Sequence, residues 1–138
     1  AWAEGTREVR AVKPKSIAKS LAIGSPADGR YVIDVARESH GAVVSVWEES
    51  VAEGIELLAR TEGIFGETAA GVTIAALQKI AREIDPDETV VAYITGNGLK
   101  TIDVIGPRVN VVNVEPMFES LEEQLQGESI RIPALASL

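Results

Sequence analysis

Residues 67–98, ETAAGVTIAALQKIAREIDPDETVVAYITGNG, decide the expected fold. Residues 67–84 carry apolar side chains on nearly every side, and a helix with that pattern is buried. A turn is expected over 85–88. Residues 89–94 then form a continuous apolar run, which is typical of a strand in a parallel sheet that is covered on both faces. A buried helix followed by a buried strand predicts an α/β layer architecture.

The same alternation of patterns extends outward in both directions from this stretch. Helices are expected over 25–40, 48–62 and 117–126, and strands over 9–12, 42–46, 109–114 and 129–132. The first of these helices should begin at Ser25-Pro26, which suits a helix start, and should stop at His40-Gly41. We therefore expect a three-layer sandwich in which helices flank a mostly parallel sheet.

Composition excludes several classes of protein. The chain has 138 residues, which suits one domain, and 13 basic against 21 acidic residues give a net charge of −8. That charge argues against a nucleic-acid partner, and neither a polybasic segment nor a long apolar run indicates a membrane. With no Cys and a single His, neither disulfides nor a metal site are expected. These features fit a cytoplasmic protein.

The residues alone place the candidate site directly after the most apolar strand. In open α/β sheets, ligands bind beyond the carboxyl ends of the strands, which here means Thr95-Gly96-Asn97-Gly98. A Thr hydroxyl could pair with a ring nitrogen, and the two glycines would let the backbone approach a flat ligand. The alternative is a β-hairpin, because Asn-Gly between apolar runs is a strong hairpin signal. The pattern favours neither interpretation.

Glu67, which opens the longest predicted helix, is a second candidate. Its carboxylate could face a ligand pocket, but an acid in the first turn is more often a partner of the helix dipole, and the residues alone favour that interpretation. The chain contains no Walker loop, no G-x-G-x-x-G and no G-x-S-x-G motif. By motifs alone, it is an α/β domain without an assigned chemistry.

Four segments, taken together, carry a family resemblance. They are KSIAKSLAIGSP at 15–26, ARESHG at 36–41, LLARTEGIFGE at 57–67 and TGNGLK at 95–100. In this order and spacing they resemble threonine synthase, a pyridoxal-phosphate lyase of the tryptophan-synthase-β fold type. The similarity extends over nearly all of residues 9–105. The resemblance implies a partial large domain of that fold type, called fold type II.

The resemblance also implies which part of such an enzyme is present. Residues 1–105 would be the C-terminal part of the large domain, and 106–138 a C-terminal extension of unknown role. In the family, the cofactor-binding lysine and the glycine-rich phosphate loop belong to preceding sequence, and the chain begins at Ala1 without a Met. No catalytic residue is therefore expected in this chain. It should be inactive alone, with the N-terminal half as its missing partner; a homo-oligomer is left open.

The implied activity is the conversion of O-phosphohomoserine and water to threonine and phosphate with pyridoxal 5′-phosphate. By the resemblance, Thr95 would hydrogen-bond the pyridine nitrogen of the cofactor, and Gly96, Asn97 and Gly98 would shape that edge of the pocket. Glu67 and the Gly24-Ser25 loop would line the pocket, in roles that the resemblance does not specify.

Some positions depart from the family pattern and keep other functions open. The family often has Asn at the position of Ser25 and His at that of Asn97, and it has Pro and Ser at those of Thr68 and Ala70. Trp47 stands where a helix-capping side chain is usual. Two alternatives follow. One is a related fold-type II enzyme such as a threonine or serine dehydratase, and the other is a non-catalytic module that binds a small ligand or a partner chain.

Overall fold

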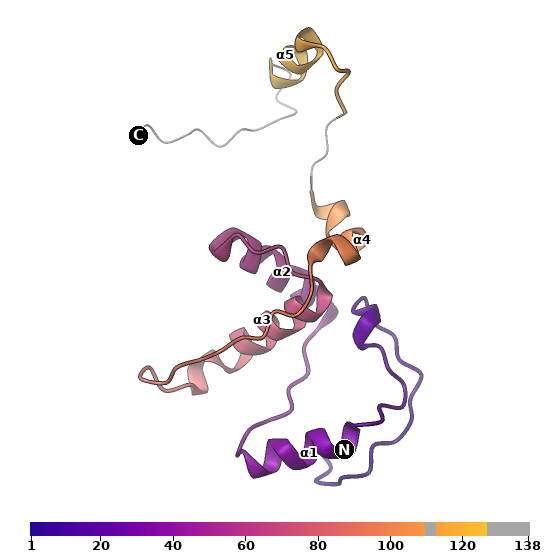
Figure 1. Cartoon of the computed structure of the whole chain (residues 1–138), viewed down its shortest axis with the longest axis vertical. Helices are drawn as coiled ribbons and strands as arrows, with labels where there is room; N and C mark the ends of the chain where they lie inside the picture. Colours follow the sequence, from indigo (N-terminus) through magenta and orange to yellow (C-terminus); the bar gives the residue numbers. More distant parts are fainter. Residues whose placement is uncertain (110–112, 127–138) are drawn as a thin grey trace. The chain divides into compact units, whose positions relative to one another are not determined.

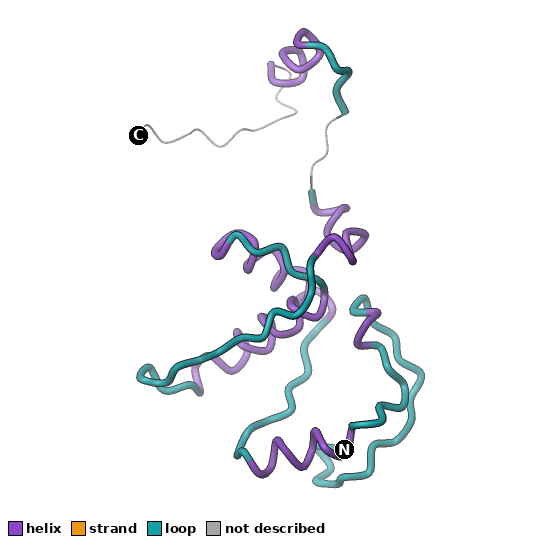
Figure 2. Tube along the Cα trace, viewed as in Figure 1, coloured by secondary structure: helices purple, strands orange, loops and turns teal. Residues whose placement is uncertain are grey.

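The computed structural model of the chain describes residues 1–109 and 113–126. The chain divides into two compact units, Ala1–Ile105 and Gly106–Leu138, and each is considered by itself. Helices and connecting loops make up the described part of both units (Figures 1 and 2). The candidate site residues all belong to the first unit.

The first α-helix, α1, spans Gly29–Glu38 and begins later than expected. Ser25 does not cap it; Asp28 occupies the N-cap without a side-chain hydrogen bond, after a turn in which the Gly29 N–H donates to Pro26. The predicted stop is confirmed, because His40 adopts a left-handed φ of 54° and ends the helix. Asn, Asp and His tolerate this conformation better than most other residues.

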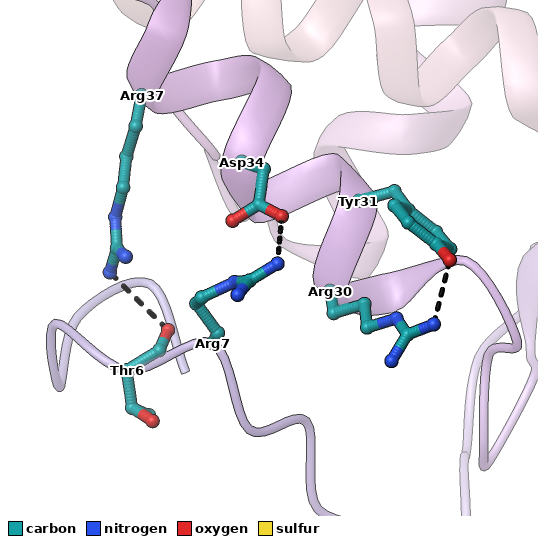
Figure 3. A network of polar contacts seen from close by, with 6 residues as sticks. All are labelled: Thr6, Arg7, Arg30, Tyr31, Asp34 and Arg37. Carbon is teal, nitrogen blue, oxygen red and sulfur yellow. Dashed lines mark hydrogen bonds and ion pairs between the residues drawn. The ribbon is translucent and has the colours of Figure 1, made fainter.

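Polar contacts hold the N-terminal segment against α1, as Figure 3 shows. Arg7 forms an ion pair with Asp34, and Arg37 Nη2 donates to the main-chain oxygen of Thr6 at 3.4 Å. Hydrogen bonding to Asp34 raises the pKa of the Arg7 guanidinium above its ordinary value. The first residues of the chain are thereby attached to a helix although they belong to no regular element themselves.

The helix predicted over 48–62 is confirmed as α2, Glu48–Glu62. Gly63 ends it with a left-handed φ of 67°, and its N–H donates to Ala59 at 3.0 Å. Trp47 occupies the N-cap without a side-chain hydrogen bond, as expected for a residue whose indole has no acceptor. The Glu48 side chain instead accepts a hydrogen bond from the N–H of Ile17, a residue outside α2, at 2.9 Å.

The longest predicted helix is confirmed as α3, Thr68–Ile80, which continues into the short 3₁₀ helix η2, Ala81–Glu83. Fewer residues of α3 are buried than the sequence predicted. One face is buried, and it carries Thr68, Ala70, Gly71 and Ala75. Most of the remaining apolar positions of α3 are only half-buried. The prediction assumed a sheet on the opposite side of the helix, and the described residues provide none.

Helices α2 and α3 lie side by side at very short range (Figure 1). A Cβ added to Gly54 would lie 2.6 Å from the main-chain oxygen of Gly71. A Cβ added to Gly71 would lie 2.8 Å from Ile55 Cγ1 and would overlap the Val51 carbonyl. Ile55, only 1% exposed, lies beside this contact in the core. Two facing glycines therefore allow the backbones to approach where no side chain would fit.

The predicted sheet is not confirmed, because no described residue forms a strand (Figure 2). Residues 9–12, 42–46 and 89–94 are loop segments. In the last of them Val91 and Tyr93 are 71% and 78% exposed. A strand requires a neighbour that takes its backbone hydrogen bonds, and an apolar sequence alone does not supply one.

Beyond residue 97 the structure contains short helices that the sequence analysis missed. They are η3, Gly98–Thr101; α4, Ile102–Ile105; and, in the second unit, η4, Gly106–Arg108. One or two turns are too short to show an apolar period. The helix predicted over 117–126 is confirmed as α5, Phe118–Gln126.

Two predicted strands fall partly or wholly beyond what the structure describes. Residues 109, 113 and 114 of the strand predicted over 109–114 are not in a strand, and its residues 110–112 lie outside the described residues, as does 129–132. Across residues 1–109 and 113–126, no helix has both the length and the apolar character needed to cross a membrane.

An ion pair joins the segment before α1 to α4. The 3₁₀ helix η1 spans Lys19–Leu21, and Lys19 Nζ lies 2.7 Å from Asp103 Oδ2. The Lys19 ammonium, through this hydrogen bond and its charge, lowers the pKa of the Asp103 carboxyl below its ordinary value of 3.8. Both side chains are exposed, so the pair is screened by salt.

We predict that Gly71→Ala destabilises the protein, although the change favours an isolated helix by about 1 kcal/mol. The added methyl has no space beside Val51 and Ile55, and overpacking of this kind costs about 1–3 kcal/mol. The urea midpoint of unfolding should therefore fall. Gly106→Ala is the control, because a Cβ there has no atom within 4 Å and should leave the midpoint unchanged. An increase for Gly71→Ala would contradict the close crossing.

We predict a pH-dependent contribution from the Lys19–Asp103 pair. Because the folded pKa of Asp103 lies below the unfolded one, the unfolded state binds more protons, and stability rises with pH. The contribution is present above the ordinary carboxyl pKa of 3.8 and is lost as the pH falls through the lower folded value. Asp103→Asn should therefore lower the urea midpoint near neutral pH and should have little effect in strong acid. An equal effect at both pH values would contradict the pair.

Candidate functional site

Two chain segments meet at the start of α3. The Glu67 N–H donates to the Gly96 carbonyl at 3.0 Å, and the Gly98 N–H donates to the Phe65 carbonyl at 2.8 Å. Between these hydrogen bonds, Gly66 and Asn97 form an isolated antiparallel bridge. Residues 65–67 and 96–98 are thereby fixed to each other, and we refer to these two segments together as the bridge site.

The hairpin interpretation of Asn97-Gly98 is wrong. Asn97 does not turn the chain back; it caps η3, and its Oδ1 accepts the Leu99 N–H at 2.9 Å. The Asn97 carbonyl also accepts the Lys100 N–H at 3.2 Å. Asn is a preferred helix cap as well as a preferred turn residue, because its side chain competes for nearby backbone N–H groups. The local sequence could not separate these two uses.

Glu67 is buried in the bridge site. Its side chain is 7% exposed, and Oε2 lies 2.8 Å from Lys100 Nζ. The carboxylate lies directly against Gly96, where a Cβ would overlap it. Although Glu67 occupies the N-cap of α3, its side chain makes no capping hydrogen bond. Glu67 does stand at the start of α3, where the residues alone placed an acid beside the helix dipole. The structure adds that its carboxylate is buried and paired with a lysine.

Thr95, at the edge of the bridge site, is exposed, and its hydroxyl makes no hydrogen bond to the other described residues. The adjacent Gly96 is fixed through its carbonyl to Glu67. The exposed Thr95 therefore directly precedes a backbone position that is fixed by a hydrogen bond. Its hydroxyl remains available to a ligand as a neutral donor or acceptor.

The structure does not place Gly24 and Ser25 in the bridge site through any contact among the described residues. The Gly24 carbonyl accepts the Val12 N–H at 2.8 Å, and a Cβ on Gly24 would lie 3.2 Å from Pro14 Cδ. Ser25 is exposed. The structure thus brings together Glu67 with Gly96, Asn97 and Gly98, while the Gly24-Ser25 loop is held against 12–14. The cofactor roles of all these residues stay predictions.

Sequence reasoning missed several residues of the site. Phe65 lies under Gly98, where a Cβ would approach the ring to 2.6 Å. Lys100, which the sequence analysis gave no role, is the ion-pair partner of Glu67. Thr68, which follows Glu67, buries a hydroxyl oxygen that has no hydrogen-bond partner within the described residues. No local pattern links residues so far apart along the chain, and only the bridge between the two segments reveals them.

Comparison with known proteins defines the class of this chain. The family described as "Pyridoxal-phosphate dependent enzyme" matches residues 1–96, which is more than half of the chain. The chain belongs to this family. The match includes Glu67, Thr95 and Gly96 and ends one residue before Asn97.

The similar curated proteins are threonine synthases, which confirms the resemblance. That of Bacillus sp. (strain ULM1) is 34% identical over 83% of this chain and 34% of its own length. That of Halalkalibacterium halodurans is 36% identical over 81% and 31%, and that of Methanocaldococcus jannaschii is 41% identical over 65% and 23%. The chain thus spans about a quarter to a third of the length of these relatives.

The bridge site fits one edge of pyridoxal phosphate. A hydroxyl that is free of internal hydrogen bonds, as in Thr95, can pair with the pyridine nitrogen. The space that a side chain on the adjacent Gly96 would take is filled by the Glu67 carboxylate. Among the described lysines, Lys19, Lys79 and Lys100 are each bound to a protein oxygen. Lys13 and Lys15 are exposed. None of these lysines is assigned to covalent attachment of the cofactor, and the placement of the cofactor ring beside Thr95 stays a prediction.

We predict that Gly98→Ala disrupts the bridge site. The methyl would displace the Phe65 ring and lengthen the hydrogen bond from the Gly98 N–H to the Phe65 carbonyl. Unfolding in urea should show a loss of about 1–3 kcal/mol, and pyridoxal phosphate should bind more weakly in a fluorescence titration of the complete polypeptide that contains these residues. Leu99→Ala is the control, because Leu99 is 70% exposed. If both variants behave like the parent, Gly98 is not required for close packing.

Proposed function

We propose that this chain forms the C-terminal part of a threonine synthase, which converts O-phosphohomoserine and water to threonine and phosphate. The observation that carries the proposal is the family match over residues 1–96 together with the fixed bridge site and the free Thr95 hydroxyl. The threonine synthases compared above are 34–41% identical to this chain. As in the sequence prediction, the large domain would be a three-layer sandwich with a mostly parallel sheet.

Bound pyridoxal phosphate supplies an electron sink for the substrate carbon atoms. In the proposed arrangement, the Thr95 hydroxyl donates a hydrogen bond to the pyridine nitrogen. A hydroxyl is neutral, so it orients the ring without stabilising a proton on that nitrogen as a carboxylate would. Gly96 and Asn97 form the backbone edge that faces the ring, and Gly98 keeps this edge attached to Phe65.

The remaining assignments are parts of the same proposal. Glu67 lines the pocket from the start of α3, and Gly24 and Ser25 stay pocket-lining candidates on a separate loop. The lysine that attaches the cofactor and the groups that bind phosphate would come from sequence that precedes residue 1 in the complete polypeptide. Residues 106–138 would form a C-terminal extension. We place the enzyme in the cytoplasm, which accords with a chain that lacks Cys.

The test compares the complete polypeptide that contains these residues with residues 1–138 alone. With pyridoxal phosphate and O-phosphohomoserine, the complete polypeptide should release threonine and phosphate in equal amounts, and residues 1–138 should release neither. Formation of a 2-oxo acid and ammonia from threonine or serine would instead support the dehydratase alternative. Failure of the complete polypeptide to bind the cofactor would support a non-catalytic module.

We predict that Thr95→Val lowers the rate of threonine formation about tenfold, because one hydrogen bond to the cofactor, of about 1.4 kcal/mol, is lost. Thr95 is exposed and makes no hydrogen bond to other described residues, so the urea midpoint should not change. Thr95→Ser keeps the hydroxyl and is the matched control; it should retain most of the activity. Equal activity of all three proteins would remove Thr95 from the cofactor site.

A further inference from the structure

Glu67 and Lys100 form an ion pair whose two ends lie in different surroundings. The Glu67 side chain is 7% exposed, whereas the Lys100 side chain is 62% exposed. A buried carboxylate is costly unless a cation or hydrogen-bond donors compensate it. Lys100 Nζ, at 2.8 Å from Oε2, provides the compensating charge. The negative end of the pair therefore lies inside the bridge site and the positive end at its surface.

Lys100 is the charged partner of Glu67. Within the described residues, Oε2 makes no regular hydrogen bond, so the approach of Lys100 is its polar contact. Charged groups on the neighbouring elements are engaged elsewhere. Lys79 of α3 donates to the Ser45 carbonyl at 2.9 Å, and Asp103 of α4 is paired with Lys19. Glu62, the last residue of α2, is exposed.

The position of the carboxylate connects the pair to the cofactor edge. Glu67 lies against Gly96, and its N–H donates to the Gly96 carbonyl at 3.0 Å. Thr95, the proposed partner of the pyridine nitrogen, directly precedes this glycine. A negative charge near a ring nitrogen favours its protonated form, and a compensated charge has much less effect. The balance between Glu67 and Lys100 therefore controls the field where the ring would lie.

We propose that Glu67 and Lys100 are a positioning pair that holds Gly96 in place and keeps the cofactor edge beside Thr95 electrically neutral. This inference rests on the proposed function, because that proposal places the cofactor ring at Thr95. Neither residue needs to touch the reacting atoms. The pair acts through the Gly96 backbone and through its charge balance, and so it ensures that the ring nitrogen meets a neutral hydroxyl.

The experiment is a pH titration of the visible absorbance of bound pyridoxal phosphate, without substrate, in the complete polypeptide that contains these residues. The quantity compared between variants is the midpoint, the pH at which half of the absorbance change has occurred. Lys100→Gln leaves an uncompensated carboxylate and should raise the midpoint by about one pH unit. Glu67→Gln leaves the exposed ammonium and should lower the midpoint by a smaller amount, because solvent screens that charge. The double variant should return close to the parent midpoint, and Lys100→Arg should match the parent.

A merely structural pair would not produce shifts of opposite sign. Midpoints that stay at the parent value in both single variants, or that move in the same direction, would overturn the inference. If Lys100→Gln fails to fold, Glu67→Gln and the double variant decide, because the first must lower the midpoint and the second must restore it. Unmoved midpoints in an enzyme that still forms threonine overturn only this inference. Absence of threonine formation with the expected shifts overturns only the proposed reaction.

Discussion

The close crossing of α2 and α3 is the constraint on which the rest of the first unit depends. Gly54 and Gly71 allow the two backbones to approach, and the core around Ile55 packs beside this contact. Packing of the amphipathic faces, more than the intrinsic preference of each residue, stabilises such helices. Since α3 begins at Thr68, this crossing also places the residues that precede it, and the bridge site starts there.

The bridge site determines which backbone and side-chain groups lie next to the start of α3. Two main-chain hydrogen bonds join 65–67 to 96–98, and both need glycines at close range to Glu67 and Phe65. The result is a hydrogen-bonded backbone next to Thr95 that brings a buried carboxylate close to Gly96, while Thr95 itself is exposed. A positioned neutral group next to a compensated charge is a means of controlling the protonation of a bound heterocycle.

Because the chain belongs to the pyridoxal-phosphate-dependent family, we interpret the bridge site and Thr95 as parts of a cofactor site. The cofactor performs the electronic work in such enzymes, and the protein contributes orientation and electrostatics. In the proposed function, this chain contributes the residues at the ring edge. Its relatives are about three to four times longer than the part that matches this chain. The proposed function accordingly requires that further sequence supplies the rest of the site.

The sequence by itself determined the helices α2, α3 and α5 and the family. Residues 48–62 and 68–83 were predictable because the apolar period, and for the first of them the glycine stop at Gly63, act within a few residues. The tertiary structure alone decided that Asn97 caps a helix and makes no hairpin, that Glu67 is buried, and that Lys100 pairs with it. These outcomes depend on contacts between distant segments, and local preferences cannot encode them. For the same reason an apolar run such as 89–94 does not form a strand without a neighbour.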